Sequence, residues 1–446
     1  MNLPDGPQMP QWLETIHLIL RPLEFFDEMG KRYGDAFTLG DIDNSPVVYF
    51  SHPQAIKDIF TADPNIFEST SPIHVKTLVG ENSLAIIDGE LHKRQRRLLM
   101  PPFHGERMRV YGQLICAITR QVIAKWDIGQ VFSVRLVMQE ITLRVILQAV
   151  FGLHQGWRYE KLRQLLGSLV DAVSSTSKAS LLFIPGLQWD LGAWSPWGKF
   201  VRLRQQIDQL LYSEIQERKQ SMDFSRTDIL TLLLMARDDD GQPMTDVELR
   251  DQLLTLLFAG HETTASALAL ALYWVHYLPE VKSKLENEIS TVCHNADPNL
   301  IVRLPYLIAI CQETLRLHPI AFQTNPRRLK TSLEIMGYQL ESGTTLVGLT
   351  YLTHKREDLY PQPKQFKPER FIKRQFAPYE YFPFGGGNRS CIGMAFAQFE
   401  MKLILATIFS RWRLALVEQR PIKLVRHTIT VAPPNSLRML VINQVD

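Results

Sequence analysis

The sequence predicts a mainly α protein with small β-sheets. Helical periodicity covers most of the 446 residues, while the alternation typical of strands is confined to short segments within 46–50, 333–349 and 411–446. A capping box at residues 245–248 opens a helix that nothing interrupts before Pro279. That helix would be roughly 50 Å long, which is enough to cross a whole domain.

The remaining elements follow from capping residues, prolines and glycines taken in chain order. The other expected helices span 11–33, 53–60, 88–97, 107–125, 133–152, 159–175, 199–220 and 394–409. The expected strands span 46–50, 333–340 and 345–349, with two or three more in 411–446. Residues 66–85 show no periodicity and are expected to form a long loop, and a hairpin turn is expected at 341–343.

Bulk composition excludes several classes of protein. Hydrophobic residues make up 45% and charged residues 21%, as in an ordinary globular protein. A net charge of +3 is too small to indicate nucleic-acid binding. The cysteines show no CxxC spacing, so neither a zinc site nor a disulfide framework is expected. They are Cys116, Cys293, Cys311 and Cys391.

The chain shows no expected targeting or membrane segment. The first ten residues lack both a basic region and an apolar core, so no signal peptide is expected. The longest uncharged apolar run, 263–278, is too short to span a bilayer. We therefore expect a cytoplasmic protein without a stable membrane anchor.

The most informative stretch is Phe-Gly-Gly-Gly-Asn-Arg-Ser-Cys-Ile-Gly at 384–393. Consecutive glycines permit positive φ angles and let the backbone approach a flat, bulky group. Cys391 lies before a predicted helix and after Arg389, and both the helix dipole and the guanidinium favour the thiolate. The ring of Phe384 would keep water from the sulfur. A lone thiolate in a glycine cradle suits the proximal ligand of a haem iron.

These ten residues resemble the cysteine-ligand signature of the cytochrome P450 family, Phe-x-x-Gly-x-Arg-x-Cys-x-Gly, with every fixed position filled. The resemblance implies that Cys391 ligates the iron and that Phe384, Arg389 and Gly393 contact the cofactor. No CxxCH motif indicates covalent attachment, so haem b is expected. The chain looks most like soluble bacterial members, cyanobacterial ones in particular.

The resemblance also decides the expected domain organisation. Length alone would favour two or three domains. Motifs spread from residue 92 to residue 393 must converge on one cofactor, so a single domain over 1–446 is predicted, with haem between the long central helix and the Cys-ligand loop.

The middle of the long helix carries Ala-Gly-His-Glu-Thr-Thr at 259–264. Gly260 removes a side chain where a flat ligand could press on the helix, and the Thr263 hydroxyl can turn onto the carbonyl of Ala259. The hexapeptide resembles the family's oxygen-activation motif, which implies that Thr263 and Glu262 are catalytic and that Ala259 and Gly260 line the cofactor. The alternative interpretation is a threonine-rich stretch of a buried helix.

Two groups of basic residues are expected to bind the two propionates of haem. His92 and Arg96 are four apart on a predicted helix, so they share a face that can hold a carboxylate. The family often has Trp-x-x-x-Arg here, and His-x-x-x-Arg is a recurrent bacterial variant. Farther along, Arg327 is the predicted further propionate contact, with Arg328 as the runner-up. The neighbouring bases either form a solvated face or help to dock an acidic electron donor. They are Lys93, Arg94 and Arg97.

Two further features rest on the resemblance. Glu313, Arg316 and Arg370 match a buried ionic triad that braces the Cys-bearing loop. The apolar segment 181–197 matches a mobile lid over the substrate entrance, although an ordinary buried connector is the alternative. An apolar lid would favour an apolar substrate.

The function implied is a haem-thiolate monooxygenase that inserts one atom of O2 into a C–H bond of a fatty acid, terpenoid or steroid-like molecule. No flavin or ferredoxin module is recognisable within the 446 residues. Electrons are therefore expected from a separate ferredoxin and its NAD(P)H-dependent reductase. The alternatives are a non-catalytic haem sensor or apolar-ligand carrier, and an O2-independent haem-thiolate isomerase or dehydratase. The intact Glu262-Thr263 pair argues against the isomerase or dehydratase.

Overall fold

The computed structural model describes residues 3–40, 45–70, 73–105, 107–174, 188–221, 223, 225–292, 296–427 and 430–445. The chain divides into two compact units, each assembled from segments far apart in the sequence. The first unit comprises Met1–Ser71, Ala309–Cys391 and Ile429–Val431. The second comprises Pro72–Ile308, Ile392–Thr428 and Ala432–Asp446. Helix α15 (Pro305–Leu317) begins in the second unit and ends in the first.

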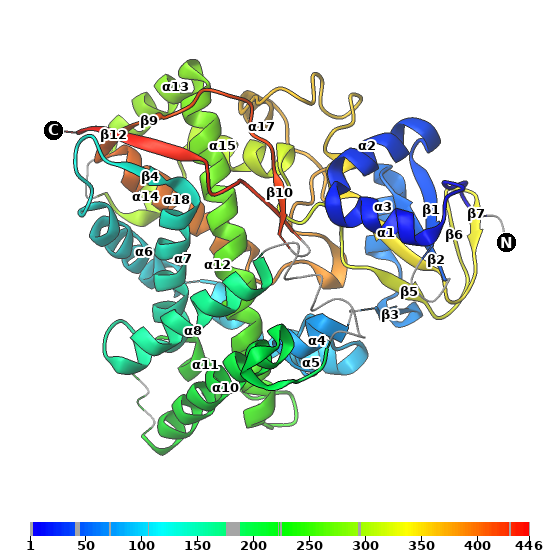
Figure 1. Ribbon diagram of the computed structural model, residues 1–446, viewed down its shortest axis with the longest axis horizontal. Helices are drawn as coiled ribbons and strands as arrows, with labels where there is room; N and C mark the ends of the chain where they lie inside the picture. The colour runs from blue at the N-terminus through cyan, green and yellow to red at the C-terminus, as the bar shows by residue number, and fades with distance from the viewer. Residues whose placement is uncertain are drawn as a thin grey trace. The chain divides into compact units, whose positions relative to one another are not determined.

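The first unit is built around a five-stranded sheet with the order β1-β2-β8-β5-β3. Strands β2 and β8 are parallel, and the other neighbours in this sheet are antiparallel. Apolar side chains of these strands and of α3 form the core, in which Val48, Phe50, Ile56 and Leu346 are fully buried. Strands β6 and β7 form a separate hairpin beside the sheet (Figure 1).

The elements of this unit are short. Its helices are α1 (Gln11–Leu20), α2 (Pro22–Tyr33), α3 (Pro53–Thr61), η1 (Pro64–Ile66), α16 (Thr350–Thr353), α17 (Glu369–Lys373) and η5 (Gly387–Arg389). Its strands are β1 (Ala36–Gly40), β2 (Pro46–Phe50), β3 (Phe67–Ser69), β5 (Arg327–Leu329), β6 (Leu333–Ile335), β7 (Tyr338–Leu340) and β8 (Thr345–Gly348).

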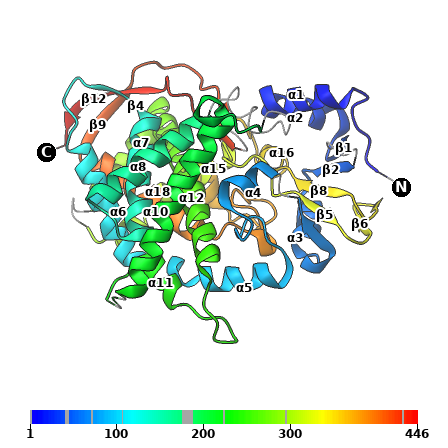
Figure 2. The same ribbon diagram turned by 60° about the horizontal axis from the view of Figure 1, so that its bottom comes forward.

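The second unit is a bundle of helices around α12 (Asp246–Tyr277). Helix α12 packs most extensively against α7 and also against α10 and α18 (Figure 2). Its residues from Thr264 to Tyr273 are all buried, because helices cover it on several sides. The predicted capping box is present: Glu248 N–H donates to Thr245, and Thr245 N–H donates to Glu248.

The other helices of this unit are α4 (Ile73–Val79), α5 (Gly89–Leu99), η2 (Pro101–Phe103), α6 (Arg107–Ile123), α7 (Val134–Phe151), α8 (Trp157–Ser174), η4 (Gly192–Trp194), α10 (Pro196–Gln220), α11 (Ile229–Met235), α13 (Pro279–Ser290), α14 (Pro298–Ile301) and α18 (Met394–Phe409). Its three-stranded sheet has the order β4-β12-β9. These strands are β4 (Val131–Ser133), β9 (Trp412–Leu416) and β12 (Arg438–Gln444). Strand β10 (Val425–His427) also belongs to this unit, whereas β11 (Thr430–Ala432) begins in the first unit and ends in the second.

Three sequence predictions are wrong in detail. The single helix expected over 11–33 is two helices, because Pro22 forces Arg21 out of the helical conformation, with φ −146° and ψ 59°. The loop expected over 66–85 contains strand β3 and helix α4, whose packing against the rest of the fold the local pattern could not reveal. The mainly α fold with small sheets is confirmed.

The hairpin expected at 341–343 is the third error. The hairpin instead joins β6 to β7 through Met336 and Gly337, which both have positive φ. Strand β8 leaves this ribbon and pairs with β2 and β5. Pairing of β8 with a strand almost 300 residues earlier in the chain is a non-local choice that alternation alone does not encode.

Candidate functional site

The Cys391 loop, residues 382–391, begins in the core of the first unit and ends at an exposed cysteine. Phe382 is buried and packs edge-on against Phe60 with ring centroids 5.5 Å apart. Gly385 N–H donates to the carbonyl of Phe382 at 3.0 Å, and Cys391 N–H donates to the carbonyl of Phe384 at 2.9 Å. Cys391 is exposed, whereas Cys116 and Cys311 are buried. The loop therefore presents one thiol on a hydrogen-bonded scaffold.

The glycines of this loop meet two different requirements. Gly385 and Gly387 have φ of +67° and +62°, a region that L side chains rarely adopt. A Cβ on Gly386 would lie 2.2 Å from the ring of Phe60. The positive φ angles predicted from the sequence are confirmed. The close approach at Gly386 is to a phenylalanine of the same unit.

Arg327 is held against the same loop. It is 6% exposed, and its guanidinium donates to the carbonyls of Ile59 and Gly386, each at 3.1 Å. Burial and the positive charge of Arg389 together lower the pKa of Arg327 to about 10. Arg328 is the next residue of β5, so its side chain leaves the opposite face of the strand. Arg327, the arginine preferred in the sequence prediction, is thus hydrogen-bonded to the Cys391 loop.

The positive charge of Arg389 helps to lower the pKa of Arg327, and an anion bound between two such cations would be stabilised. This is the environment in which a carboxylate of a cofactor would be stabilised. An exposed thiol and two guanidiniums on one loop region are the donor set that an iron porphyrin with propionates requires, so the residues of the first unit fit such a group.

The predicted Thr263 hydrogen bond is confirmed in the second unit. The Thr263 hydroxyl donates to the carbonyl of Ala259 at 2.6 Å, and the hydroxyl of Thr264 donates likewise to Gly260 at 3.0 Å. Ala259 is exposed, while Thr263 is partly exposed. Helix α12 remains α-helical throughout its length. The threonine hydroxyl that binds Ala259 keeps its lone pairs available to accept a further hydrogen bond.

The carboxylate of Glu262 points toward α7. Arg135 donates to it at 2.7 Å, and Gln139 donates to its other oxygen. The same Arg135 also donates to Asn435 at 2.9 Å. The role of Arg135 and Gln139 was not apparent from the sequence, because nothing in a helix more than a hundred residues earlier indicates which carboxylate it will meet.

Gly260 lies against Ile146 of α7, a contact that the sequence did not indicate. A Cβ at this position would lie 2.9 Å from Cδ1 of Ile146 in α7. The small residue therefore permits close packing of α12 on α7, a role that the sequence interpretation did not include. The proposed contact of Gly260 with a flat ligand stays a prediction.

Helix α5 places His92 and Arg96 on one face, as expected from their spacing. His92 is 3% exposed. Arg94, assigned in the sequence to a possible partner-binding surface, instead forms ion pairs with Asp238 at 2.6 Å and Glu248 at 2.8 Å. It therefore ties α5 to the start of α12.

The other two bases of this cluster remain largely exposed. Lys93 forms an ion pair with Glu90, and Arg97 forms one with Asp239.

At Gly393, which caps α18, an added Cβ would meet no atom of the described residues within 4 Å. Gly393 is therefore not required by the protein's own packing.

The ionic triad predicted in the first unit is present. Glu313 and Arg316 are both 0% exposed, and Arg316 donates to Glu313 at 2.7 and 2.8 Å. Arg370 donates to the same carboxylate at 3.1 Å. Arg316 also donates to the carbonyl of His354. The triad therefore links α15 to the chain segments that lead toward the Cys391 loop.

Hydrogen bonds join the segment before α5 to α12. Asn82 donates through its backbone and its side chain to Asp251, at 2.9 and 3.1 Å. Gln252 accepts from the backbone N–H of Leu84 at 3.1 Å. These hydrogen bonds hold the backbone of residues 82–84 in place. Sequence reasoning missed Asp251 and Gln252, because their partners lie about 170 residues away.

The predicted lid falls only partly on the described residues. Residues 181–187 lie outside them, and the described part, 188–197, contains η4 and the start of α10. Trp194 is 96% exposed and Trp189 is 68% exposed. Within 188–197, these side chains do not match a buried connector.

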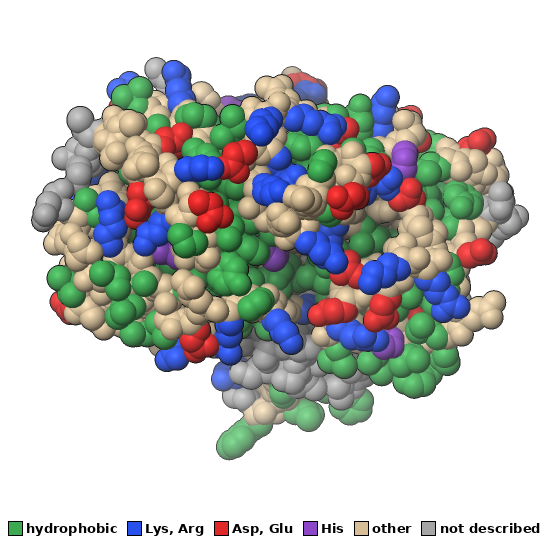
Figure 3. Space-filling model, turned by 90° about the horizontal axis from the view of Figure 1, so that it is seen from above, with side chains coloured by type: hydrophobic (Ala, Val, Ile, Leu, Met, Phe, Trp, Pro, Cys, Tyr) green, Lys and Arg blue, Asp and Glu red, His purple; other side chains and the backbone are tan. Residues whose placement is uncertain are grey.

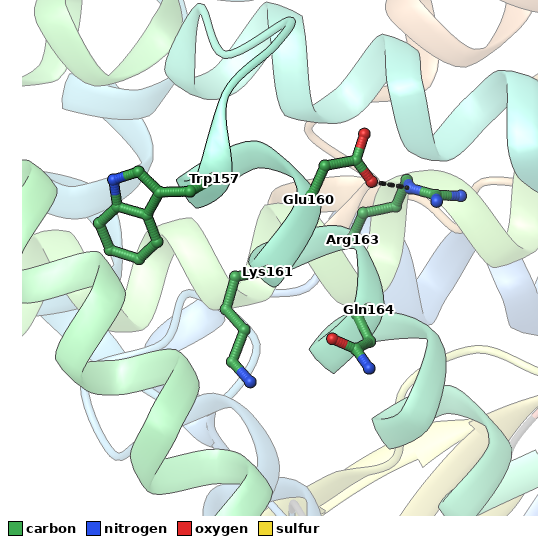
Figure 4. A pocket seen from close by; sticks show the side chains of 5 residues that line it. All are labelled: Trp157, Glu160, Lys161, Arg163 and Gln164. Carbon is green, nitrogen blue, oxygen red and sulfur yellow. Dashed lines mark hydrogen bonds and ion pairs between the residues drawn. The ribbon is translucent and has the colours of Figure 1, made fainter.

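The hollow shown in Figure 4 is a less suitable site. It is an open depression lined by five residues of α8 alone, including an ion pair between Glu160 and Arg163 at 3.1 Å. Across the part of the chain that the structure describes, no three His, Cys, Asp or Glu side chains are grouped so as to hold a metal ion.

Charge and hydropathy add two observations. On the face shown in Figure 3, Lys and Arg side chains are interspersed with Asp and Glu, so that face presents no field of a single sign. Helix α12 has the length and composition of a membrane span, but 67% of its most apolar window is buried inside the protein. Core helices of soluble proteins pass the same test.

Comparison with known protein families identifies the family of this chain. Residues 4–441 match the family model described as cytochrome P450. Cytochrome P450 135B1 of Mycobacterium tuberculosis is 36% identical over 93% of this chain and 86% of the relative. Cytochrome P450 135A1 of the same species is 34% identical over 99% of this chain and 96% of the relative.

Solved structures give the same result. The cyanobacterial CYP120A1 with bound retinoic acid has a TM-score of 0.86 and 27% identity, with full coverage of both chains. The heme domain of cytochrome P450DA also has a TM-score of 0.86, covering 100% of this chain and 98% of that one, and at 22% identity it shows the fold alone. The exposed Cys391, the full-length family match and the shared fold show that this chain belongs to the cytochrome P450 family of haem-thiolate monooxygenases.

Proposed function

We propose that this enzyme inserts one atom of O2 into a C–H bond of an apolar small molecule, such as a fatty acid, a terpenoid or a steroid-like compound. The observation that carries the proposal is the exposed Cys391, presented on a hydrogen-bonded glycine loop beside the cationic pair Arg327 and Arg389. A thiolate there is stabilised by positive charge and by the nearby start of α18.

The cofactor in this proposal is haem b. Cys391 would ligate the iron, Arg327 and Arg389 would bind a propionate, and His92 and Arg96 would also bind a propionate. Phe384, Gly393, Ala259 and Gly260 contact the macrocycle. When bound, the haem supplies the oxidation chemistry, and the thiolate donates electron density that favours O–O cleavage. The protein's own groups bind, orient and move protons.

Proton delivery is assigned to Thr263 and Glu262. The Thr263 hydroxyl is oriented by its bond to Ala259, so it can hold a water molecule in a fixed place. The Glu262 carboxylate is anchored by Arg135 and Gln139. For Glu262 to pass a proton toward Thr263, one of its two oxygens must leave or share its present donor. Arg135 and Gln139 therefore control how readily Glu262 delivers protons.

The substrate class rests on two observations. The similar cyanobacterial structure contains retinoic acid, an apolar polyene with a carboxylate. In this chain, the described part of the predicted lid, residues 188–197, exposes Trp189, Leu191 and Trp194. Apolar side chains near an entrance favour the entry of an apolar substrate.

The proposed electron donor is a ferredoxin reduced by an NAD(P)H-dependent reductase. Lys93 and Arg97 remain the exposed cations of α5 that an acidic ferredoxin could bind, with side chains 47% and 64% exposed. The proposed location is the cytoplasm. It is supported by the burial of α12, since the described helix that is long and apolar enough to span a membrane is an element of the core.

A ligand screen tests the proposal. Purified enzyme is titrated with long-chain fatty acids, terpenoids and steroids, and displacement of water from the haem iron is read from the absorption spectrum. Compounds that shift the spectrum are then incubated with O2, NAD(P)H, a ferredoxin and its reductase, and oxygenated products are measured by mass spectrometry. Ligand binding without product from any compound would favour a sensor or carrier instead.

A further inference from the structure

His354 lies at the end of α16, where no motif drew attention to it. It is 0% exposed. Its Nε2 accepts a hydrogen bond from the backbone N–H of Phe382 at 3.0 Å. An N–H buried at this depth would cost free energy if it had no acceptor. The imidazole therefore satisfies a backbone donor that neither a helix nor a strand satisfies.

Phe382 is the first residue of the Cys391 loop, so this bond lies at its origin. From Phe382 the loop continues through two successive backbone hydrogen bonds, Gly385 N–H to Phe382 O at 3.0 Å and Cys391 N–H to Phe384 O at 2.9 Å. Displacement of Phe382 would shift the first of these bonds and, through the loop, the second. The position of the Cys391 backbone thus depends on where Phe382 is held.

The His354 ring is itself fixed on several sides. It stacks on Tyr381 with centroids 5.3 Å apart and meets the ring of Phe382 at the same distance and a steep angle. The His354 carbonyl accepts from Arg316 at 2.8 Å. Because Arg316 is also bound to Glu313, the ionic triad holds His354, and His354 in turn holds the loop.

We propose that His354 is a positioning residue for the Cys391 loop, acting through its hydrogen bond from Phe382, and that it fixes the sulfur for iron ligation. The proposal rests on the proposed role of Cys391 as the iron ligand. The proposed role does not require His354 to contact Cys391 or a substrate. It acts through the backbone of the loop.

The charge state of His354 agrees with this role. The groups that face it are Arg316 of α15 and the phenols of Tyr360 and Tyr381. Burial, reinforced by the charge of Arg316, lowers the pKa of His354 to about 3. The ring is therefore neutral at physiological pH, with its proton on Nδ1 and a lone pair on Nε2 to accept from Phe382.

The test compares His354→Leu, which removes the acceptor, with His354→Gln, whose amide oxygen can replace it. Each holoenzyme is assayed for haem content, for the fraction of haem with the thiolate-type carbon monoxide spectrum, and for hydrogen exchange of residues 382–391. We expect H354L to lose thiolate-type haem by about twofold or more and to exchange about tenfold faster in this segment. H354Q should recover most of both properties.

His276 supplies the matched control. It is a buried histidine of α12 whose pKa is also lowered to about 3, and its Nδ1 lies 2.8 Å from the carbonyl of Leu272. H276L should leave the thiolate fraction and the exchange of 382–391 unchanged. Equal losses in H354L and H276L, wild-type behaviour of H354L, or a defect in H354Q equal to that of H354L would each overturn the proposal.

A second measurement covers the case in which H354L does not fold. On acidification, wild-type enzyme should lose the thiolate-type spectrum at a higher pH than H354Q, because glutamine does not titrate. Coincident acid midpoints would overturn the proposal. Hydrogen exchange separates this outcome from failure of the proposed function. If Cys391→Ser kept the wild-type spectrum, Cys391 would not be the ligand, while the exchange of 382–391 would still report on His354.

Discussion

The guanidinium of Arg135 lies 2.7 Å from the carboxylate of Glu262, and both side chains are largely buried, at 5% and 19% exposed. An ion pair in such surroundings is costly to break on one side only, because the remaining charge is left without compensation. We expect Arg135→Met to lower the free energy of unfolding by about 3 kcal/mol. Glu262→Gln should cost a similar amount, about 3 kcal/mol, because it leaves the buried guanidinium of Arg135 without its counter-charge.

Urea titrations of the two single variants and the double variant measure this coupling. If the losses of unfolding free energy in the two single variants summed to the loss in the double variant, the two side chains would not be coupled, and Arg135 would not control Glu262. The same variants, assayed for product formed per NAD(P)H consumed, show whether releasing the carboxylate changes proton delivery.

Thr263→Ala should divert electrons from product to peroxide, because the hydroxyl that holds a proton-delivering water is gone. The measure is peroxide and product per NAD(P)H consumed, using a ligand from the screen. Thr264→Ala is the matched control, since its hydroxyl makes the same bond to the carbonyl four residues back but its side chain is buried. Unchanged coupling in T263A, or equal uncoupling in both variants, would contradict the assignment.

The buried triad should dominate the stability of the first unit. Arg316→Met removes a fully buried cation from Glu313 and should destabilise the protein by about 3–5 kcal/mol. Arg374→Met is the control, because the Arg374 side chain is 47% exposed and its ion pair with Glu380 should contribute less than about 1 kcal/mol. Chemical unfolding monitored by circular dichroism compares them. Similar losses for both would show that burial does not decide the contribution.

Glycine-to-alanine changes separate packing within the protein from contact with the cofactor. Gly386→Ala should prevent correct folding of the loop, since its Cβ would lie 2.2 Å from Phe60. Gly393→Ala meets no described protein atom, so the apoprotein should keep wild-type stability. A fall in haem affinity of G393A, measured by haem titration of the apoprotein, would then report contact with the macrocycle. Unchanged affinity would remove Gly393 from the proposed site.

Acid should destabilise the fold over a defined pH range. Burial lowers the pKa of His276, His318 and His354 from 6.5 to about 3. Because the unfolded chain binds these protons first, stability is lost as pH falls below about 6.5 toward 3. Each histidine costs about 1.4 kcal/mol per pH unit once the unfolded state is protonated. Urea unfolding at pH 7, 6 and 5 measures the slope, and replacement of one histidine by glutamine should reduce it.

The sequence by itself determined the fold class and several elements. Helix α18 spans the predicted residues 394–409, and strand β2 spans 46–50. These succeeded because caps, glycines and periodicity are local signals read within a few residues. The Thr263 bond to Ala259 is likewise fixed by a four-residue spacing along one helix.

Only the tertiary structure decided the contacts between distant segments. Strand β8 pairs with β2, and Glu262 forms an ion pair with Arg135. Arg94 forms ion pairs with Asp238 and Glu248. His354 accepts a hydrogen bond from Phe382. Each of these partners lies many residues away along the chain. A charged or hydrogen-bonding side chain indicates that it needs a partner when it is buried, but which partner it meets is set by packing of the whole core.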